Sequence, residues 1–390
     1  MIPLGRDLIV PCDEKGHRVR LRSGRFFFAS ATCPRCGAPV DPLRWRRVVR
    51  FFLGLGVART PDRVDFGVWA AAWIVFGLTL AGVLIFRLTA DVWWPATTIL
   101  YGPRWVVLLP VASVAGLAIW RDRVMLVPLG LALLVTSGPF LGFRLNPLRM
   151  LARPNQHDVH VATLNAAGRV PRVGPEGVIE DLGVDILMIQ ECGVGLAELL
   201  AEVPGWEVRR RSSLCAVSRY PIVGSAMMDG RELQRIGGSA LTTTFTVAVG
   251  GRELNVTNVH LETPRRGFEL MLSGQFFEGG ESLRQKSILR EIELGRAQRW
   301  VDSIPGPRIV VGDFNTPPES RHFQRHWGQW TDAFAARGFG VGGTRLNGWI
   351  RPRIDYILVD DHWSVIEART GPDVGSDHLP VIAVLRLRVD

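Results

Sequence analysis

Seven short apolar segments between about residue 157 and the end of the sequence carry, at one end or just outside it, polar residues of the kinds that bind metals and phosphates. In RIVVGDFNTP (308–317), three β-branched apolar residues lead to Asp313 and Asn315, which two-residue spacing places on one side of a strand. The polar residues at the other six segments are, in chain order, Asn165, Gln190, Glu191, Arg219, Asn258, His260, Arg353, Asp355, Asp377 and His378.

The chemistry that these residues offer is that of hard oxygen ligands. The oxygen donors are Asn165, Glu191, Asp313, Asn315 and Asp377. The segments contain few thiols and no cluster of three histidines, so Mg²⁺ or Mn²⁺ is favoured over a catalytic zinc. A bound divalent ion of this kind holds a phosphate oxygen and stabilises the charge that develops on it.

The histidines complete a set suited to phosphate-ester hydrolysis by an in-line water. His260 and His378 could donate to the other phosphate oxygens or protonate a leaving group. Asp355 is the type of residue that orients a neighbouring imidazole. Any single Asp or Asn at a strand end is more often a turn former, so the prediction rests on the whole set.

Short strands with few helices must position these residues from about His157 to the end of the chain. Such a pattern predicts a sandwich of two sheets, and strand ends that converge on one rim would form a single pocket. The segment 263–300 departs from it. Its second half, Ser282 to Trp300, has helical spacing. With Arg265 and Arg266 it is interpreted either as a lid beside the pocket or as a loop before a surface helix.

The ordered motifs T-x-N, Q-E, S-R-Y-P, N-x-H-L, G-D-F-N, R-I-D-Y-I and S-D-H-L-P resemble those of the endonuclease/exonuclease/phosphatase superfamily. That superfamily includes DNase I-like nucleases, abasic-site endonucleases, neutral sphingomyelinases and inositol-polyphosphate 5-phosphatases. The resemblance covers about residues 157–390. It implies a catalytic domain over 154–390, an α/β fold of the DNase I-like four-layered sandwich type, and metal-dependent hydrolysis of a phosphoric ester.

The resemblance also implies roles for the metal side of the site. Glu191 resembles the principal metal ligand, Asn165 its partner, and Asp377 a residue beside the metal. Asp313 resembles the carboxylate that orients or deprotonates the attacking water, and Asn315 its partner at the phosphate.

Three further roles follow from the same motifs. His378 resembles the histidine that contacts the phosphate, and Asp355 the carboxylate paired with a histidine. His260 resembles a second histidine, which contacts the phosphate or acts as an acid.

Three uncharged segments lie within residues 63–150, namely Val68–Phe86, Trp105–Trp120 and Val124–Phe143. About 20 apolar residues span a bilayer, so three transmembrane helices are predicted, with a buried helical hairpin as the alternative. The dense arginines before the first segment favour a cytoplasmic N-terminus. Three crossings then place the C-terminal domain outside the cytoplasmic membrane, whereas two would leave it in the cytoplasm.

The first 62 residues form a predicted basic head. Cys33-Pro-Arg-Cys36-Gly is typical of a zinc knuckle, and Cys12 and His17 could complete a tetrahedral site of the zinc-ribbon type. The alternative is a redox-active or inert pair of thiols. Cys192 and Cys215, in the C-terminal domain, form either a disulfide or two core thiols.

The charge is unevenly distributed along the chain. The formal net charge is +9, but residues 154–390 contain 26 basic and 29 acidic residues. A general polyanion-binding surface is therefore disfavoured there.

We expect a membrane-anchored phosphoesterase whose partners are the lipid bilayer and a phosphate ester, such as a lipid head group. The alternatives are an extracytoplasmic DNA or RNA nuclease and a non-catalytic binding module. The sequence indicates no protein partner.

Overall fold

The computed structural model describes residues 8–12, 17–21, 31–40, 63–121, 125–147, 153–239, 241–346, 348 and 350–388. The chain divides into two compact units. The N-terminal unit comprises Met1–Val83 and Trp105–Thr136. The C-terminal unit comprises Leu84–Arg104 and Ser137–Asp390, so it includes a segment that lies between two of the predicted membrane helices.

The N-terminal unit combines two small hairpins with apolar helices. Its strands, paired β1 with β2 and β3 with β4, are β1 (Leu8–Pro11), β2 (Arg18–Leu21), β3 (Ala31–Thr32) and β4 (Pro39–Val40). The helices of the region 63–140, some of which continue into the C-terminal unit, are α2 (Arg63–Thr89), α3 (Trp94–Tyr101), η1 (Arg104–Val107), α4 (Leu108–Arg121), α5 (Leu126–Val135) and the π-helical η3 (Thr136–Phe140).

One helix of the described residues is long and apolar enough to cross a membrane by itself. It covers Gly67–Thr89, 23 residues with a mean hydropathy of 2.2. Trp94–Tyr101 and Arg104–Ile119 meet the same criteria only as a pair bent by 100°, and Leu126–Phe140 is shorter. The structure thus supports one candidate span, and the arrangement with three spans stays a prediction.

Two six-stranded sheets form the C-terminal unit. The first has the order β13-β14-β12-β11-β10-β9, with β9 (Ile222–Met227), β10 (Leu241–Val249), β11 (Arg252–His260), β12 (Arg308–Asp313), β13 (Thr331–Asp332) and β14 (Asp355–Val359). The second has the order β15-β16-β5-β6-β8-β7, with β5 (Val159–Asn165), β6 (Ile186–Gln190), β7 (Glu207–Arg211), β8 (Leu214–Ser218), β15 (Trp363–Thr370) and β16 (Val381–Leu387).

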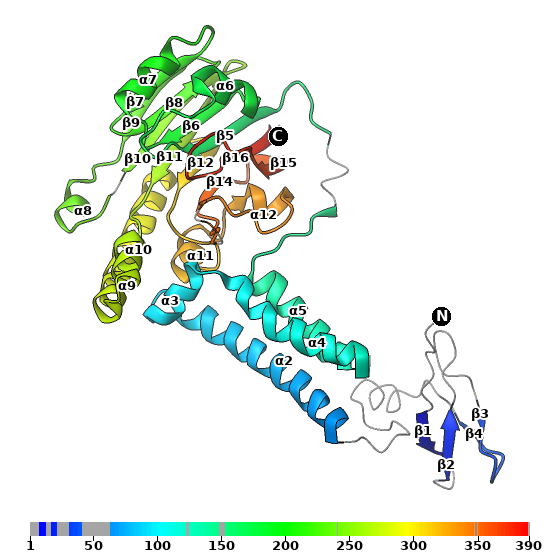
Figure 1. Cartoon of the computed structure of the whole chain (residues 1–390). Helices are drawn as coiled ribbons and strands as arrows, with labels where there is room; N and C mark the ends of the chain where they lie inside the picture. The colour runs from blue at the N-terminus through cyan, green and yellow to red at the C-terminus, as the bar shows by residue number, and fades with distance from the viewer. Residues whose placement is uncertain are drawn as a thin grey trace. The chain divides into compact units, whose positions relative to one another are not determined.

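Apolar residues on alternate positions of the strands fill both faces of each sheet. In β12, Ile309 and Val311 belong to the core between the two sheets, whereas Val310 packs with helices on the outer face. The helices of the unit, several of which cover the outer faces (Figure 1), are α6 (Gly174–Leu182), α7 (Val194–Ala201), α8 (Arg231–Arg235), α9 (Arg265–Leu272), α10 (Phe276–Asp302), α11 (Arg321–Trp327) and α12 (Ala333–Arg337). This mixed α/β architecture agrees with the expected DNase I-like sandwich.

The strand register brings polar residues of the first sheet to one level. His260 pairs with Asp313 across the parallel strands β11 and β12, and Asp313 pairs with Asp355 across β12 and β14. Gly312 allows the close approach of β11, because a Cβ there would lie 2.0 Å from the Val259 carbonyl oxygen, and its φ of +133° also favours glycine. One end of the first sheet therefore presents two carboxylates and an imidazole.

Candidate active site

The centre of the site is a buried cluster of Asp313, Asp355 and His378, whose potential ligand atoms all lie within 4.8 Å of one another. His378 Nδ1 lies 2.9 Å from Asp355 Oδ2, and His378 Nε2 lies 3.8 Å from Asp313 Oδ2. The bond at Nδ1 orients the imidazole so that Nε2 faces Asp313. The predicted pairing of Asp355 with a histidine corresponds to this contact.

Asn165 joins this cluster to the second sheet. Its Nδ2 donates to Asp313 Oδ2 at 3.0 Å and to Glu191 Oε1 at 3.2 Å. Glu191 follows β6 directly and has a left-handed backbone with φ of 50°, a strained conformation that for a residue other than glycine often marks a functional site. The carboxylate of Glu191 is 37% exposed, so it borders both the buried cluster and solvent.

His260 completes this side of the site. Its Nε2 lies 3.7 Å from Glu191 Oε1 and 3.9 Å from Asp313 Oδ2. These separations are longer than hydrogen bonds. The imidazole therefore lies between the two carboxylates without a hydrogen bond from Nε2 to either, so Nε2 is available to a substrate.

Asn315 contacts the protein through its main chain and its amide nitrogen. Its N–H donates to Asp313 Oδ1 at 2.8 Å, and its Nδ2 donates to the Leu261 carbonyl at 2.8 Å. With φ of 47°, Asn315 is another strained residue of the site. The turn therefore fixes one oxygen of Asp313 and leaves Oδ2 for Asn165 and the histidines.

Asp377 lies beside the central cluster. Its Oδ2 forms an ion pair with Arg345 Nη1 at 2.5 Å, and its Oδ1 lies 3.9 Å from His378 Nε2. The buried Oδ1 has no hydrogen-bond partner among the described residues. Arg345 is a residue of the site that the motifs did not indicate.

Other residues of the seven motifs have structural surroundings. Gln190 Nε2 donates to Asn258 Oδ1 at 2.6 Å, and Asn258 Nδ2 donates to backbone carbonyls of β6 and β8, which joins the two sheets. Arg353 is buried with Asp332, whereas Arg219 is half-exposed beside Asp185.

Burial and neighbouring charges raise the pKa values of two residues of the cluster, Asp313 and His378. Burial raises the pKa of Asp313, and the nearby Asp355 carboxylate raises it further. Burial alone would lower the pKa of His378, but the charges of Asp355 and Asp313 outweigh it and raise the pKa to about 9. His378 is therefore an imidazolium at neutral pH, and it lies beside Asp313, whose proton affinity is increased.

The donor set is suited to a hard divalent ion. Glu191 and Asp377 offer carboxylate oxygens, whereas Asn165 turns its Nδ2 to the cluster and its Oδ1 accepts from the Ala167 N–H at 2.9 Å. Buried carboxylate oxygens of Asp355 and Asp377 have no hydrogen-bond partner within the described part of the chain. Unsatisfied buried oxygens of this kind are costly unless a cation or water is bound. The residues thus fit Mg²⁺ or Mn²⁺ by their chemistry.

The family was then identified by comparison with known proteins. A model described as "Endonuclease/Exonuclease/phosphatase family" matches residues 152–378. The chain belongs to this family, and it is accordingly a metal-dependent phosphoric ester hydrolase. Among curated proteins, none matches the chain significantly.

Solved structures of low sequence identity resemble the chain. An endonuclease/exonuclease/phosphatase from Beutenbergia cavernae is 19% identical, with a TM-score of 0.43, and the match covers 60% of this chain and 72% of that one. A humanized D. rerio TDP2 is 14% identical, with a TM-score of 0.44 and coverage of 59% and 100%. D. rerio TDP2 complexed with a single-strand DNA product is also 14% identical, with a TM-score of 0.43 and coverage of 59% and 99%.

Tyr101 is a contact of the site that sequence reasoning did not find. Its hydroxyl donates to the Asn315 carbonyl at 2.8 Å, and the buried Arg290 lies 5.6 Å from the centre of its ring. Tyr101 comes from α3, far in sequence from the motifs. It therefore fixes the strained turn that carries Asp313 from a segment outside the predicted catalytic domain.

Tyr101→Phe should lower kcat by about five- to tenfold and leave KM nearly unchanged, because the loss of one buried hydrogen bond loosens the turn of Asn315. The measurement is steady-state hydrolysis of bis-p-nitrophenyl phosphate. Tyr220→Phe is the matched control, since Tyr220 lies outside the site. Equal kcat values in both variants would contradict a role for Tyr101 in positioning.

Proposed function

We propose that the protein is a membrane-anchored, Mg²⁺-dependent phosphoesterase that cleaves its ester by attack of an in-line water. The observation that carries this proposal is the continuous set of contacts from Glu191 through Asn165, Asp313 and His378 to Asp355. It joins a ligand set for a hard cation to a base and to an oriented, charged imidazole.

Each residue has a role in this mechanism. Glu191, Asn165 and Asp377 would hold the ion, which supplies charge stabilisation to the phosphate when bound. Asp313 takes a proton from the attacking water, and its raised pKa makes it a stronger base. His378, held protonated by Asp355, donates to a phosphate oxygen, and Asn315 is placed to orient the phosphate. The new bond joins the water oxygen to phosphorus, and the ester oxygen leaves with a proton from His260.

The substrate class proposed is a phosphodiester or phosphomonoester of the membrane or cell envelope. The apolar helix at 67–89 and the slight excess of acidic residues after residue 153 support it over a nucleic acid. The alternative, a DNA or RNA nuclease, is supported by the breadth of the family.

A panel of substrates distinguishes the two. The purified full-length protein with Mg²⁺ is expected to cleave mixed phospholipids and to leave plasmid DNA and RNA intact. Cleavage of nucleic acid alone would establish the nuclease, and hydrolysis by neither the wild type nor Asp313→Asn would favour a binding module.

We also propose that three helices anchor the chain, with the head in the cytoplasm and the C-terminal unit outside. Supporting this, Cys192 and Cys215 form a disulfide, whereas Cys33 and Cys36 are reduced thiols. Disulfides persist mainly in oxidising compartments outside the cytoplasm. Alkaline phosphatase fused to the C-terminus should therefore be active, and green fluorescent protein fused at the same position should not fluoresce. The reverse pair of results would place the C-terminal unit in the cytoplasm.

A structural zinc in the head is the remaining part of the proposal. Cys12 Sγ lies 3.6 Å from Cys36 Sγ, and Cys33 Sγ lies 3.6 Å from His17 Nδ1. Ligands at zinc bond lengths in a tetrahedron are separated by about 3.6–3.8 Å. Four such donors leave no open position, which is the arrangement of a structural rather than a catalytic zinc.

The purified protein should carry about one zinc per chain by mass spectrometry of its metals, because four preformed donors bind zinc tightly. The double variant Cys33→Ser/Cys36→Ser should lose it, and Cys192→Ser/Cys215→Ser should retain it. Zinc absent from the wild type, or retained by the first variant, would contradict the site.

A further inference from the structure

The turn between α9 and α10 exposes large apolar side chains. Leu272 is 90% exposed, Phe277 is 85% exposed, and Phe276 is more than half exposed. We call these three residues the apolar tip. Three large apolar side chains so close together on a surface are unusual for a polypeptide that faces water on all sides, and they mark an interaction site.

The apolar tip is held in place by close packing of the helices behind it. Gly267 and Gly279 allow α9 and α10 to touch, because a Cβ on Gly279 would lie 2.7 Å from the Gly267 carbonyl oxygen. Gly280, one turn from the tip, packs on the Trp94 indole, where a Cβ would lie 2.9 Å from the ring. The tip is thus fixed beside the beginning of α3.

The chain next to this contact is also apolar and exposed. Leu88, Val92 and Trp93 are each more than half exposed, and they belong to the same unit as the tip. Leu88 lies in the last turn of the helix at 67–89 that is long and apolar enough to span a membrane. Exposed apolar residues therefore lie both at the end of that helix and on the apolar tip, and the packing of Trp94 on Gly280 joins the two segments.

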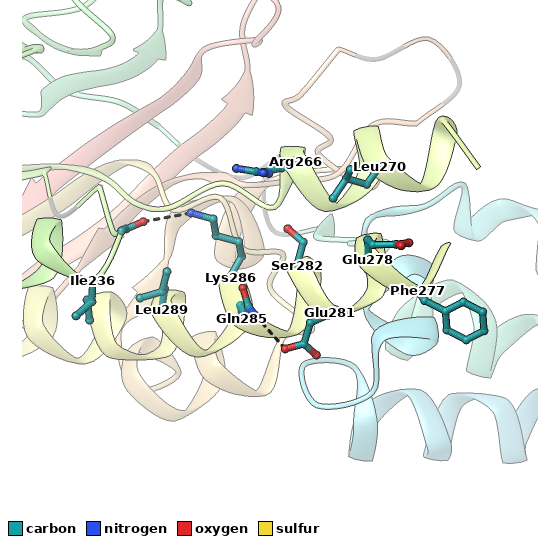
Figure 2. A pocket seen from close by; sticks show the side chains of 11 residues that line it. Ile236, Arg266, Leu270, Phe277, Glu278, Glu281, Ser282, Gln285, Lys286 and Leu289 are labelled. Carbon is teal, nitrogen blue, oxygen red and sulfur yellow. Dashed lines mark hydrogen bonds between the residues drawn. The ribbon is translucent and has the colours of Figure 1, made fainter. Parts of the chain in front are cut away.

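Polar residues lie on the other side of the hairpin. Figure 2 shows a pocket of about 720 Å³ between α9 and α10 whose lining carries charges of both signs, with the Phe277 ring pointing away from Lys286. The charged and hydroxyl residues of the lining are Arg266, Glu278, Glu281, Ser282 and Lys286. An apolar end next to charged and hydroxyl groups matches the boundary between acyl chains and head groups, where tryptophan is also enriched.

From these observations we infer that the apolar tip, together with Val92 and Trp93, docks on a lipid bilayer, with Phe277 among the acyl chains. α9 begins at Arg265, five residues after His260, so a single short helix connects this surface to the rim of the active site. This inference rests on the membrane anchoring in the proposed function, and it does not depend on catalysis.

Site-specific photo-crosslinking of the full-length protein in lipid vesicles of phosphatidylethanolamine and phosphatidylglycerol tests this inference. Benzoylphenylalanine is placed at Phe277, at Leu272, or at Val223 on β9 as the control. Val223 is also more than half exposed, and Figure 1 shows β9 far from α9 in the C-terminal unit. All variants carry Asp313→Asn, so that the result is independent of hydrolysis.

Phe277 and Leu272 should give at least about tenfold more lipid adduct than Val223, because only the tip enters the acyl region. Equal yields at the three positions would overturn the inference. Adducts of the tip with a protein, including a second copy of the chain, in place of lipid would also overturn it. Each variant replaces one exposed apolar side chain. Because two positions of the tip are tested independently, a single misfolded variant would not decide the result.

Discussion

Asp313→Asn should lower kcat by about 10³-fold, with a small change in KM. Asp313 Oδ2 is the acceptor that faces Asn165 and both histidines, and a neutral amide cannot take the proton of the attacking water. The measurement is hydrolysis of bis-p-nitrophenyl phosphate at saturating Mg²⁺. The matched control, Asp361→Asn, alters an exposed aspartate and should retain full activity.

The same variant separates catalysis from folding. Burial raises the pKa of Asp313, so its charged form is costly in the folded protein, and an isosteric amide removes that cost. The amide also loses one of the two hydrogen bonds that Asp313 accepts, from Asn315 or Asn165, so the midpoint of urea unfolding should change little. A variant that is inactive and folded supports the role of Asp313 as the base. A variant that keeps more than about a tenth of the activity would contradict it.

His378→Gln should lower kcat by about 10²- to 10³-fold, because the site loses the cation that faces the phosphate. His378 Nδ1 is held by Asp355 at 2.9 Å, and its Nε2 faces Asp313. His157→Gln, on an exposed histidine, is the control. Wild-type rates in His378→Gln would remove the imidazolium from the mechanism.

Asp355→Asn tests what keeps His378 charged. A folded-state pKa of about 9, above the ordinary value near 6.5, stabilises the fold fully below pH ~6.5, and this stabilisation is lost as the pH rises through 9. The melting temperature is measured in EDTA at pH 6.5 and at pH 9.5. Its decrease between these two pH values should therefore be larger for the wild type than for Asp355→Asn. Parallel curves would show that Asp355 does not set the charge of His378.

The residues of the central cluster could be singled out from the sequence because each lies next to an apolar strand: Asp313 ends β12, Asp355 begins β14, and His378 precedes β16. The apolar run of Ile309, Val310 and Val311 predicted a strand before Asp313, and the register of β11, β12 and β14 in the structure aligns His260 and Asp355 with it. Local patterning is enough for such residues, since neighbouring strand ends meet at one edge of a sheet.

Residues joined by long-range packing could not be predicted in this way. Tyr101 lies 214 positions from Asn315, shortly before the predicted membrane segment Trp105–Trp120, and no local pattern pairs the two. The ion pair between Arg345 and Asp377 likewise depends on the packing of a loop without periodicity. The disulfide stayed open because it depends on β6 pairing with β8, which places Cys215 opposite Ile189.

The helical region before the C-terminal unit shows another limit of sequence patterning. Hydropathy marks apolar segments but not bends, so it did not predict that Trp94–Tyr101 and Arg104–Ile119 meet at 100°. It also did not predict that 84–104 belongs to the C-terminal unit, because contacts such as Gly280 with Trp94 arise from tertiary packing.

We propose that a divalent metal and the Asp313 cluster together hydrolyse a phosphoric ester. The most direct measurement is the rate of bis-p-nitrophenyl phosphate hydrolysis by the purified full-length protein with Mg²⁺, with EDTA, and with Mg²⁺ restored. We expect activity that EDTA abolishes and that Mg²⁺ restores, and we expect Asp313→Asn to lack this activity under every condition. Hydrolysis that persists in EDTA, or that Asp313→Asn performs as fast as the wild type, would contradict it.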